Sequence, residues 1–397
     1  MVTKTPSRPL RRLIVFLALL LAGLALFLRL NYAPGQPYRD LTTASLVPES
    51  ALEEVVSSPE PIGNVAVSRT GRVFYTLHPE SRPPGPRLFE WAAGKAVPFP
   101  SPALQEQLFN TPLGLTVDGQ DRLWVIDHHQ HATGPPRVLA FDLASGALAF
   151  DHSFRRDCAP IGAFFQDLAV DATAGRLYIA DASFWGRRPA IVIYDLASDV
   201  CQRVLERDAS VRAQDWLIRT PTKEMVFFAG LGSLKVGVDG IALSPNRSWL
   251  YYAAMNHDSL FRMPTAAIAK LPSSASPAPE RVGPKPLSDG IACDAQGRVL
   301  ITDVDHGAVL RSGAGGELET LIRSPRIRWA DNLAIGQDGW VYLADSAIPD
   351  HLLRTRGHIR SRAPYFVFRF PQPGGNAPAS PEMLTLAPSR PFPTESP

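Results

Sequence analysis

One short pattern recurs six times along the chain and constrains its fold more than any other feature. Each copy has an apolar strand, a polar turn with Gly or Asn, and a second apolar strand starting eight or nine residues after the first. Two examples are LTVDGQDRLWVID from Leu115 and IACDAQGRVLITD from Ile291. The six copies begin at Val65, Leu115, Leu168, Ile241, Ile291 and Leu333. Two short strands joined by a tight turn form a β-hairpin, so we expect six hairpins of one design.

The spacing of these copies predicts a closed ring of small sheets. Consecutive copies start 42 to 53 residues apart, except for one interval of 73 that marks an insertion at residues 207–236. Such intervals fit a four-stranded antiparallel blade, and a β-sandwich gives no reason for the recurrence. We therefore predict an all-β, six-bladed β-propeller over residues 45–372. A linker at residues 31–44 precedes it, and a Pro-rich, disordered tail at residues 373–397 follows it.

The N-terminal segment has the pattern of an export signal. Arg8, Arg11 and Arg12 precede an apolar run of 16 residues from Leu13 to Leu28, a length between that of a signal-peptide core and a full membrane span. Basic residues before such a run keep that end inside and place the rest of the chain outside. We assign residues 1–30 to a signal or anchor and predict an extracytoplasmic protein, periplasmic or secreted. Anchoring in the membrane by residues 13–30 is favoured, and a cleaved signal peptide is the alternative.

Charge and cysteine content limit the partners. The formal net charge is +2, and residues 1–30 carry five basic residues and no acid, so the remainder is slightly negative. The body of the chain has no basic patch suited to phosphate backbones, and we expect no nucleic acid partner.

Cys158 and Cys201 lie near turns and are expected to form a disulfide in an exported protein. Cys293 lies in a strand-like run and is expected in the core, and the lack of a CxxC motif disfavours structural zinc.

The repeats and their flanking segments resemble a known family. The stretches GVDGIALSPNRSWLYYAAMNHDSLFRMP from Gly237, DGIACDAQGRVLITDVDHGAVLR from Asp289 and ADNLAIGQDGWVYLADS from Ala330 are similar to the bacterial branch of the major royal jelly/Yellow family. Its members are often described as related to L-dopachrome tautomerase. The resemblance covers roughly residues 45–372. It implies a six-bladed propeller that binds aromatic amines, catechol derivatives or other small molecules at one mouth of its channel, with or without catalysis.

A more distant resemblance concerns the gluconolactonase/senescence marker protein propellers, which hold a divalent metal at the axis. Their repeat starts correspond to Asp239-Gly240-Ile241 and Asp289-Gly290-Ile291 here. That family also uses a Glu before a Gly-Pro pair in its first blade, whereas this chain reads Glu60-Pro61-Ile62-Gly63. The resemblance therefore implies a site without its first-blade acid. We expect no required cofactor, with a divalent cation such as Ca²⁺, held by Asp239 and Asp289, as the alternative.

One column of residues carries the strongest chemical signal. The residue that heads the inner strand of each blade points toward the channel axis at one mouth. The column comprises Gly63, Leu113, Gln166, Asp239, Asp289 and Asp331. Carboxyl groups brought together raise one another's pKa and can act as acids or bases, or hold a cationic amine. We assign catalytic roles to Asp239, Asp289 and Asp331, and ligand binding to Gln166 and to Asn332, which follows Asp331. The competing interpretation is that these Asp residues cap turns.

A second column ends the return strands at the same mouth. It comprises Asp127, Asp181, Asp303 and Asp345, and acids in such places more often hydrogen-bond the following loop. The neighbouring loops supply Trp185, which can stack on an aromatic ligand, and His128 and Asn256, which we add to the ligand-binding residues. Other loop residues there are His129, Phe184, His257 and His306.

No nucleophile elbow, phosphate loop, dinucleotide fingerprint or HExxH motif occurs in the sequence. Three functions stay open. The first is an isomerase or tautomerase that acts on a catechol- or quinone-type compound at the channel mouth. The second is a non-catalytic binder of aromatic amines or similar ligands. The third is a metal-dependent lactone hydrolase. Among the enzyme functions, it ranks second after the tautomerase.

Overall fold

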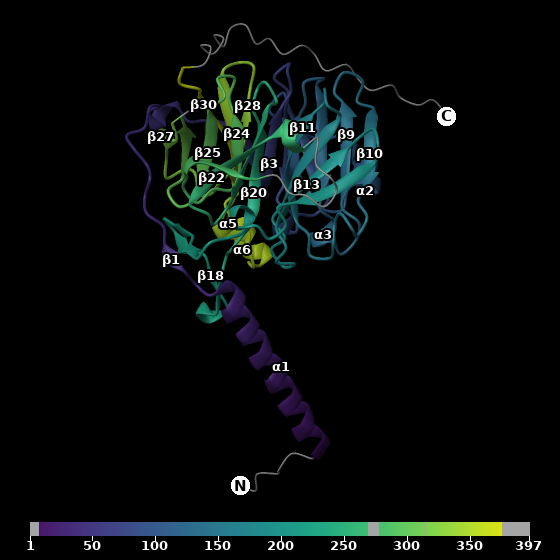
Figure 1. The fold of residues 1–397 in the computed structure, drawn as a ribbon, viewed down its shortest axis with the longest axis vertical. Coiled ribbons are helices and arrows are strands. Elements are labelled where there is room, and N and C mark those ends of the chain that lie inside the picture. The colour runs from purple at the N-terminus through teal and green to yellow at the C-terminus, as the bar shows by residue number, and fades with distance from the viewer. Residues whose placement is uncertain (1–7, 269–277, 314, 375–397) are drawn as a thin grey trace, which may run out of the picture.

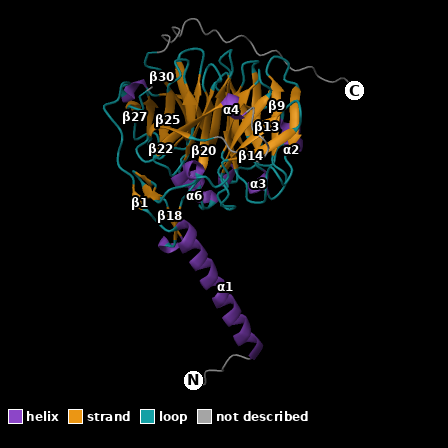
Figure 2. Cartoon of the chain, viewed as in Figure 1, coloured by secondary structure: helices purple, strands orange, loops and turns teal. Residues whose placement is uncertain are grey.

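The computed structural model describes residues 8–268, 278–313 and 315–374, and six four-stranded antiparallel sheets surround one axis in it. Figure 1 shows the sheets arranged as blades, with the helix α1 (Arg8–Tyr32) projecting from one end of the ring. Outside α1 the described chain is mainly strand and loop (Figure 2). The chain is the six-bladed β-propeller that the repeat predicts.

From the axis outward, each blade consists of four strands. The first three blades are β3 (Ile62–Val67), β4 (Val73–Leu77), β5 (Leu88–Ala92) and β6 (Lys95–Pro98); β7 (Pro112–Val117), β8 (Arg122–Asp127), β9 (Arg137–Asp142) and β10 (Leu148–Ser153); and β11 (Phe165–Asp171), β12 (Arg176–Asp181), β13 (Ala190–Asp195) and β14 (Val200–Val204). The last three are β20 (Val238–Leu243), β21 (Trp249–Ala254), β22 (Ser259–Pro264) and β23 (Glu280–Pro284); β24 (Ile291–Cys293), β25 (Val299–Asp303), β26 (Ala308–Ser312) and β27 (Leu318–Arg323); and β28 (Ala330–Ile335), β29 (Trp340–Asp345), β30 (Tyr365–Pro371) and β2 (Glu53–Ser58).

The first strand of every repeat is the innermost strand of its blade. Neighbouring inner strands contact one another in the order β3, β7, β11, β20, β24 and β28, and β28 contacts β3 again. The polar turn after the inner strand recurs for a local reason. The Asp118 carboxylate accepts hydrogen bonds from the backbone N–H groups of Gln120 and Arg122. In the fifth blade, Asp294 accepts the equivalent bonds from Gln296 and Arg298. Side-chain-to-backbone bonds of this kind favour turns over strands.

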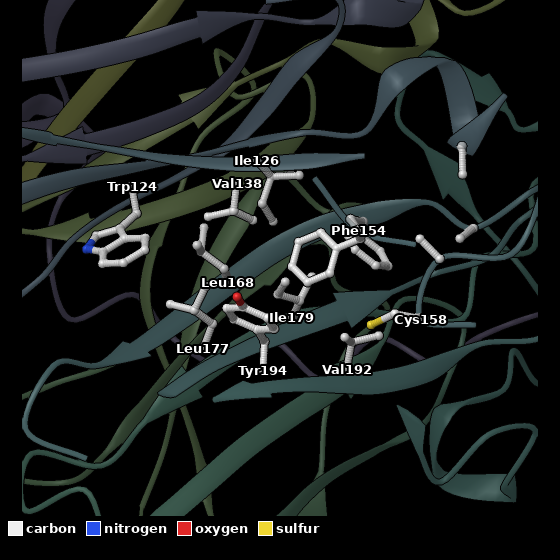
Figure 3. Packing of buried hydrophobic residues seen from close by; sticks show 14 of the residues in the cluster. Trp124, Ile126, Val138, Phe154, Cys158, Leu168, Leu177, Ile179, Val192 and Tyr194 are labelled. Atoms are coloured by element: carbon white, nitrogen blue, oxygen red, sulfur yellow. The ribbon is translucent and has the colours of Figure 1, made fainter. Parts of the chain in front are cut away.

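Apolar side chains fill the spaces between blades. Figure 3 shows one such cluster between the second and third blades, where Trp124, Ile126 and Val138 face Leu168 and Ile179. Because each blade is covered on both faces, its middle strands are apolar at consecutive positions, as in LWVI from Leu123. The core is therefore a ring of inter-blade layers.

The N-terminal part of the propeller closes the ring. Strand β2 pairs antiparallel with β30, with Val56 opposite Val367, and so forms the outer edge of the last blade. That blade thus combines strands from both ends of the propeller, an arrangement that fastens the first blade to the last through the β2–β3 connection.

The insertion predicted at residues 207–236 lies at the end of the ring from which α1 projects (Figure 1). It forms short pairs: β15 (Trp216–Leu217) runs parallel to β1 (Gln36–Pro37), β16 (Arg219–Thr220) pairs with β17 (Lys223–Glu224), and β18 (Val226–Phe227) pairs with β19 (Gly232–Ser233). The remaining short helices are α2 (Pro102–Leu108), α3 (His129–Ala132), α4 (Thr265–Ile268), α5 (Ile348–His351), α6 (Arg356–Ser361), and the 3₁₀ turns η1 (Glu49–Ala51), η2 (Pro79–Ser81), η3 (Ala209–Val211) and η4 (Phe228–Gly230).

Helix α1 is longer than the apolar run and includes the arginines before it. It is long and apolar enough to cross a membrane. Of its residues, Leu28 and Tyr32 are buried against the propeller, and the remainder is exposed or half-buried. The predicted disordered tail lies outside the described residues from residue 375 onward.

The disulfide between Cys158 and Cys201 is present, as the sequence predicts. The two Cα atoms are 6.0 Å apart, and the bridge joins residues 43 positions apart in sequence. It connects the loop before β11 to β14, the outer strand of the third blade. Cys293 is a free, half-buried thiol in β24, so it is less completely buried than a core position requires.

Reduction of this bridge should destabilise the protein. A loop of this length implies a loss of up to about 4 kcal/mol in the free energy of unfolding, by the chain-entropy model. We expect the Cys158→Ser/Cys201→Ser variant to unfold at a lower urea concentration than the wild type. Mass analysis of the alkylated, non-reduced wild type should give one free thiol, and three free thiols would contradict the bridge.

Candidate functional site

A pocket opens at the mouth of the channel where the inner strands begin, beneath the insertion. It contains about 1020 Å³ of space free of protein atoms, open solvent at the mouth included. Its walls are mainly apolar and include Phe164, Phe184, Trp185, Phe227, Met255 and Trp329. Most polar groups lie in two places: a floor formed by Gln166, Asp289 and Asp331, and one side formed by His78, Glu80 and His131. Ser233 and Tyr32 also line the pocket.

The floor contains two carboxyl groups, Asp289 and Asp331, whose pKa values are raised by burial. The Asp289 Oδ2 atom accepts a hydrogen bond of 2.6 Å from the Trp329 indole N–H. Burial nevertheless raises the pKa of Asp289 to about 7. Burial, and then the charge of Asp289, raise the pKa of Asp331 well above its ordinary value. At neutral pH the floor can therefore donate a proton as well as accept one.

Two further aspartates lie behind this floor. Burial, followed by the charge of Asp289, raises the pKa of Asp239 well above its ordinary value, and its Oδ2 atom has no hydrogen-bond partner among the described residues. Asp167 accepts hydrogen bonds from Asn64 at 2.9 Å and from Asn332 at 3.3 Å, while burial raises its pKa to about 6. Asp167, Asp239, Asp289 and Asp331 are called the acid cluster below.

The acid cluster separates the pocket from a second cavity. That cavity runs along the channel between the inner strands and is lined by residues such as Val65, Leu115 and Ile291, together with Asp167 and Asn332. A buried lysine stands close by: Lys285 donates hydrogen bonds to the carbonyl oxygens of Pro286 and Met255. Burial lowers its pKa to about 7 despite the attraction of Asp258, Asp303 and Asp239, so its positive charge offsets the cluster only in part.

Glycines at the repeat starts let the inner strands approach one another. A Cβ atom on Gly290 would lie 2.6 Å from the Asp331 carbonyl oxygen, and one on Gly240 would lie 2.9 Å from that of Asp289. The Gly290 N–H donates to the same Asp331 oxygen at 2.7 Å. The Gly of each Asp-Gly pair thus has a packing role. The Asp side chain of each pair takes no part in this packing and remains available to the channel.

A histidine–glutamate pair forms one side of the pocket. The His131 Nε2 atom lies 2.8 Å from Glu80 Oε1, while the His131 Nδ1 atom is itself buried and has no hydrogen-bond partner among the described residues. Burial would raise the pKa of Glu80, but the hydrogen bond from His131 and the charges of His131 and His78 lower it to about 2. An ionised Glu80 fixes the proton of His131 on Nε2 and leaves Nδ1 free to accept one.

Local backbone conformation positions this pair. The His78 Nδ1 atom caps η2 by accepting a hydrogen bond from the Glu80 N–H, and His131 lies on α3. Residues 129–132 all have positive φ angles, between 48° and 55°, so α3 is a left-handed turn. Non-glycine residues adopt this conformation at a cost that is commonly found at functional sites. The sequence analysis considered His128 and His129 of this HHQH run and missed His131 and Glu80.

Four of the predicted site residues line the pocket. Asp289, Asp331 and Gln166 form its floor, and Trp185 stands at its rim. Asp239 lies in the acid cluster behind the floor. Their roles in catalysis or ligand binding stay predictions.

The other three predicted residues lie elsewhere. Asn332 points to the second cavity and bonds to Asp167. His128 is buried behind the wall, with its ring 4.7 Å from that of Phe164. The Asn256 side chain is fully buried and ties the insertion to the fourth blade. It accepts a hydrogen bond from Val236 N–H and donates to the carbonyl oxygens of Trp216 and Leu234.

The second column of aspartates has the structural role that the sequence analysis favoured. Asp127 accepts hydrogen bonds from the backbone of Asn110, Thr111 and His129. Asp181, Asp303 and Asp345 bond in the same way to the backbone of the adjacent loops. These acids hold the loops at the mouth of the channel.

The residues at the axis do not fit the metal site of the gluconolactonase-like propellers. Gly63 occupies the first-blade position, and Glu60 instead forms an ion pair with Arg356. Among the described residues, the group whose ligand atoms lie within 4.8 Å of one another is Asp40, Asp303 and His306, away from the pocket. The oxygens of the acid cluster do not form such a group.

The Asp289→Asn variant tests the state of the floor through its stability. The folded-state pKa of about 7 lies above the ordinary value of 3.8, so stabilisation by the bound proton is complete below about pH 4 and is lost as the pH rises to about 7. Asparagine cannot ionise. We expect the stability of the variant relative to the wild type to rise by about 2–3 kcal/mol between pH 5 and pH 8. Urea unfolding at both pH values measures it, and a pH-independent difference would contradict the raised pKa.

Comparisons with known proteins agree with this architecture. Residues 111–314, more than half of the chain, match the profile of the family described as major royal jelly protein. A search of curated proteins finds no match. Among solved structures, a gluconolactonase from Xanthomonas campestris has 15% identity and a TM-score of 0.51, covering 86% of this chain and 98% of its own. The calcium-binding protein regucalcin from Agrobacterium tumefaciens has 16% identity and a TM-score of 0.50, covering 83% and 95%. At these identities the likeness concerns the fold alone.

Proposed function

The chain belongs to the major royal jelly protein family, and from this premise we propose that it binds a small aromatic compound in the pocket and isomerises it by proton transfer. The observation that carries the proposal is the pairing of two kinds of group in one apolar pocket. The His131–Glu80 pair supplies a base on one side, and Asp289 and Asp331 supply protonated carboxyl groups at the floor.

The proposed chemistry is a tautomerisation of a catechol- or quinone-type compound. The His131 ring shifts so that its buried Nδ1 atom reaches the ligand and takes a proton from it, and a carboxyl group of the floor returns a proton to another atom of the ligand. The ligand therefore changes its bonding without net gain or loss of atoms or electrons. Ionised Glu80 stabilises the imidazolium that forms, and the aromatic walls hold the flat ring in place. Proton exchange with solvent through the open mouth resets both groups.

A non-catalytic binder is the second candidate, and one observation favours it. Because the pKa of Asp289 lies near neutrality, an incoming cationic amine can convert this carboxyl group to the carboxylate and pair with it. The same pocket would then hold an aromatic amine without turnover.

We further propose that the propeller is extracytoplasmic and tethered by α1. The disulfide suits an oxidising compartment, and the arginines before the apolar run suit an inside N-terminus. Leu28 and Tyr32 form part of the pocket wall, which supports retention of α1 over its cleavage. Intact mass of the membrane fraction tests this: a chain that begins after residue 30 would contradict the anchor.

Two measurements on the full chain in detergent separate the functions. Titration calorimetry with dopamine measures binding, and absorbance decay of L-dopachrome measures isomerisation. Binding with accelerated decay supports the enzyme, and binding alone supports the carrier of aromatic amines. If neither dopamine nor L-dopachrome binds at millimolar concentration, the proposal is wrong.

A further inference from the structure

Exposed apolar side chains surround the mouth of the pocket. Trp185 is 52% exposed, Phe228 53% and Leu353 59%, and all three also line the pocket. They come from the loop after β12, from η4 in the insertion and from the segment after α5, which are far apart in sequence. Large apolar side chains gathered from three segments around one opening indicate an interaction surface. Trp185, Phe228 and Leu353 are called the rim.

Helix α1 ends inside this rim. The Tyr32 ring lies 5.0 Å from Phe184 and 6.3 Å from Trp185, and its hydroxyl donates a hydrogen bond of 2.6 Å to the Phe184 carbonyl oxygen. The Ser233 hydroxyl donates to the Tyr32 carbonyl oxygen at 3.2 Å. The last turn of α1 is thus fixed to the pocket wall, and the rest of the helix points away from the propeller (Figure 1).

The length of α1 sets the level of the bilayer. Residues 13–32 form about 30 Å of helix at 1.5 Å per residue, which equals the thickness of the hydrocarbon core. If the arginines before Leu13 lie at one membrane surface, Tyr32 lies at the other. Trp185 of the rim packs against Tyr32, and Phe228 and Leu353 line the same pocket mouth, so we place the rim at the same level.

Cations accompany the aromatic rings at this level. The Arg187 guanidinium lies 5.0 Å from the centre of the Tyr32 ring, and the Lys223 ammonium lies 5.0 Å from that of Phe227. Arg354 is exposed directly after Leu353. Aromatic residues combined with Arg and Lys are typical of the interface between lipid and water, where the cations meet phosphate groups.

We propose that the rim inserts into the bilayer surface and that the pocket opens into lipid, so that its ligand is a lipophilic compound drawn from the membrane. This inference rests on the proposed membrane anchor and the proposed ligand pocket, and it adds the membrane as the source of the ligand. The ligand combines an aromatic or quinone head, which reaches the carboxyl floor, with a hydrocarbon tail that passes the rim into the acyl chains. The apolar walls between rim and floor suit such a molecule better than a freely soluble catechol.

Site-directed labelling tests the position of the rim. In a Cys293→Ala background, a bimane label is attached at Phe228→Cys or Leu353→Cys, and at Gln120→Cys as a control. Gln120 is exposed in the β7–β8 turn, at the opposite end of the channel. The full chain is reconstituted into phosphatidylcholine/phosphatidylglycerol vesicles that contain lipids with nitroxide on the acyl chain. We expect quenching by at least half at positions 228 and 353 and little at 120. Quenching at positions 228 and 353 as weak as that at position 120 would overturn the inference and leave a protein partner as the occupant of the rim.

A second measurement tests the ligand class. Quenching of tryptophan fluorescence reports binding of benzoquinone and of decyl-benzoquinone to the same vesicle-bound protein, because Trp185 and Trp329 line the pocket. After correction for partitioning and for quenching in the Trp185→Phe/Trp329→Phe variant, the decyl compound should bind at least tenfold more tightly. Equal affinities would overturn the lipophilic ligand and keep the proposed pocket. Quenched rim labels without binding of either quinone or dopamine would instead contradict the proposed function.

Discussion

Replacing His131 by glutamine should lower the rate of isomerisation by a factor of about 10²–10⁴, the usual contribution of a positioned acid or base. Glutamine can still donate a hydrogen bond to Glu80, so the loop keeps its anchor. It cannot take up a proton, so the chemical step loses its base. The measurement is kcat for L-dopachrome decay, with dopamine affinity measured in parallel to show that the pocket persists.

The matched control for this variant is His129→Gln. His129 lies on the same left-handed turn, but its Nδ1 atom faces the Pro135 carbonyl oxygen, 3.0 Å away, and it does not line the pocket. We expect its kcat to stay within about twofold of the wild type. Full activity of His131→Gln would exclude His131 as the base, and an equal loss in both variants would indicate disruption of the turn.

Replacing Val56 by aspartate should have the largest effect on stability. Val56 is fully buried and packs with Ile62, Tyr342 and Val367 where β2 closes the ring. A carboxylate there has no partner, and the free energy of unfolding should fall by about 4 kcal/mol or more. Loss of the outer strand would also expose the edge of β30.

The neighbouring Ser57→Asp variant controls for the charge itself. Ser57 lies on the same strand, opposite Phe366, and is exposed. Its stability should stay within about 0.5 kcal/mol of the wild type. Urea unfolding compares the two variants, and similar midpoints would contradict closure of the propeller by β2.

Much of the fold could be predicted because the blades share one local design. An inner strand, a turn held by an Asp side chain as at Asp118 and Asp294, and a buried second strand recur in register. Equivalent positions in such a repeat meet at the axis. This symmetry is why the sequence pointed to Asp239, Asp289 and Asp331 together.

The rest of the site depends on segments that break the repeat. His131 and Glu80 lie in loops of two different blades, and their contact follows from a left-handed turn that no periodic pattern reveals. The Asn256 side chain turns to the insertion because the backbone there needs hydrogen bonds. The place of α1 depends on Tyr32 and its partners in the third blade and the insertion. Side-chain contacts that occur at only one place in the chain could not be predicted from the repeated pattern.

The most direct test of the account is a crystal structure of the protein soaked with dopamine near neutral pH. We predict density for the ring between the aromatic walls, with one polar group within hydrogen-bond distance of Asp289 or Asp331 and another facing His131. Density in the second cavity or on the outer surface, with an empty pocket, would contradict the proposed site.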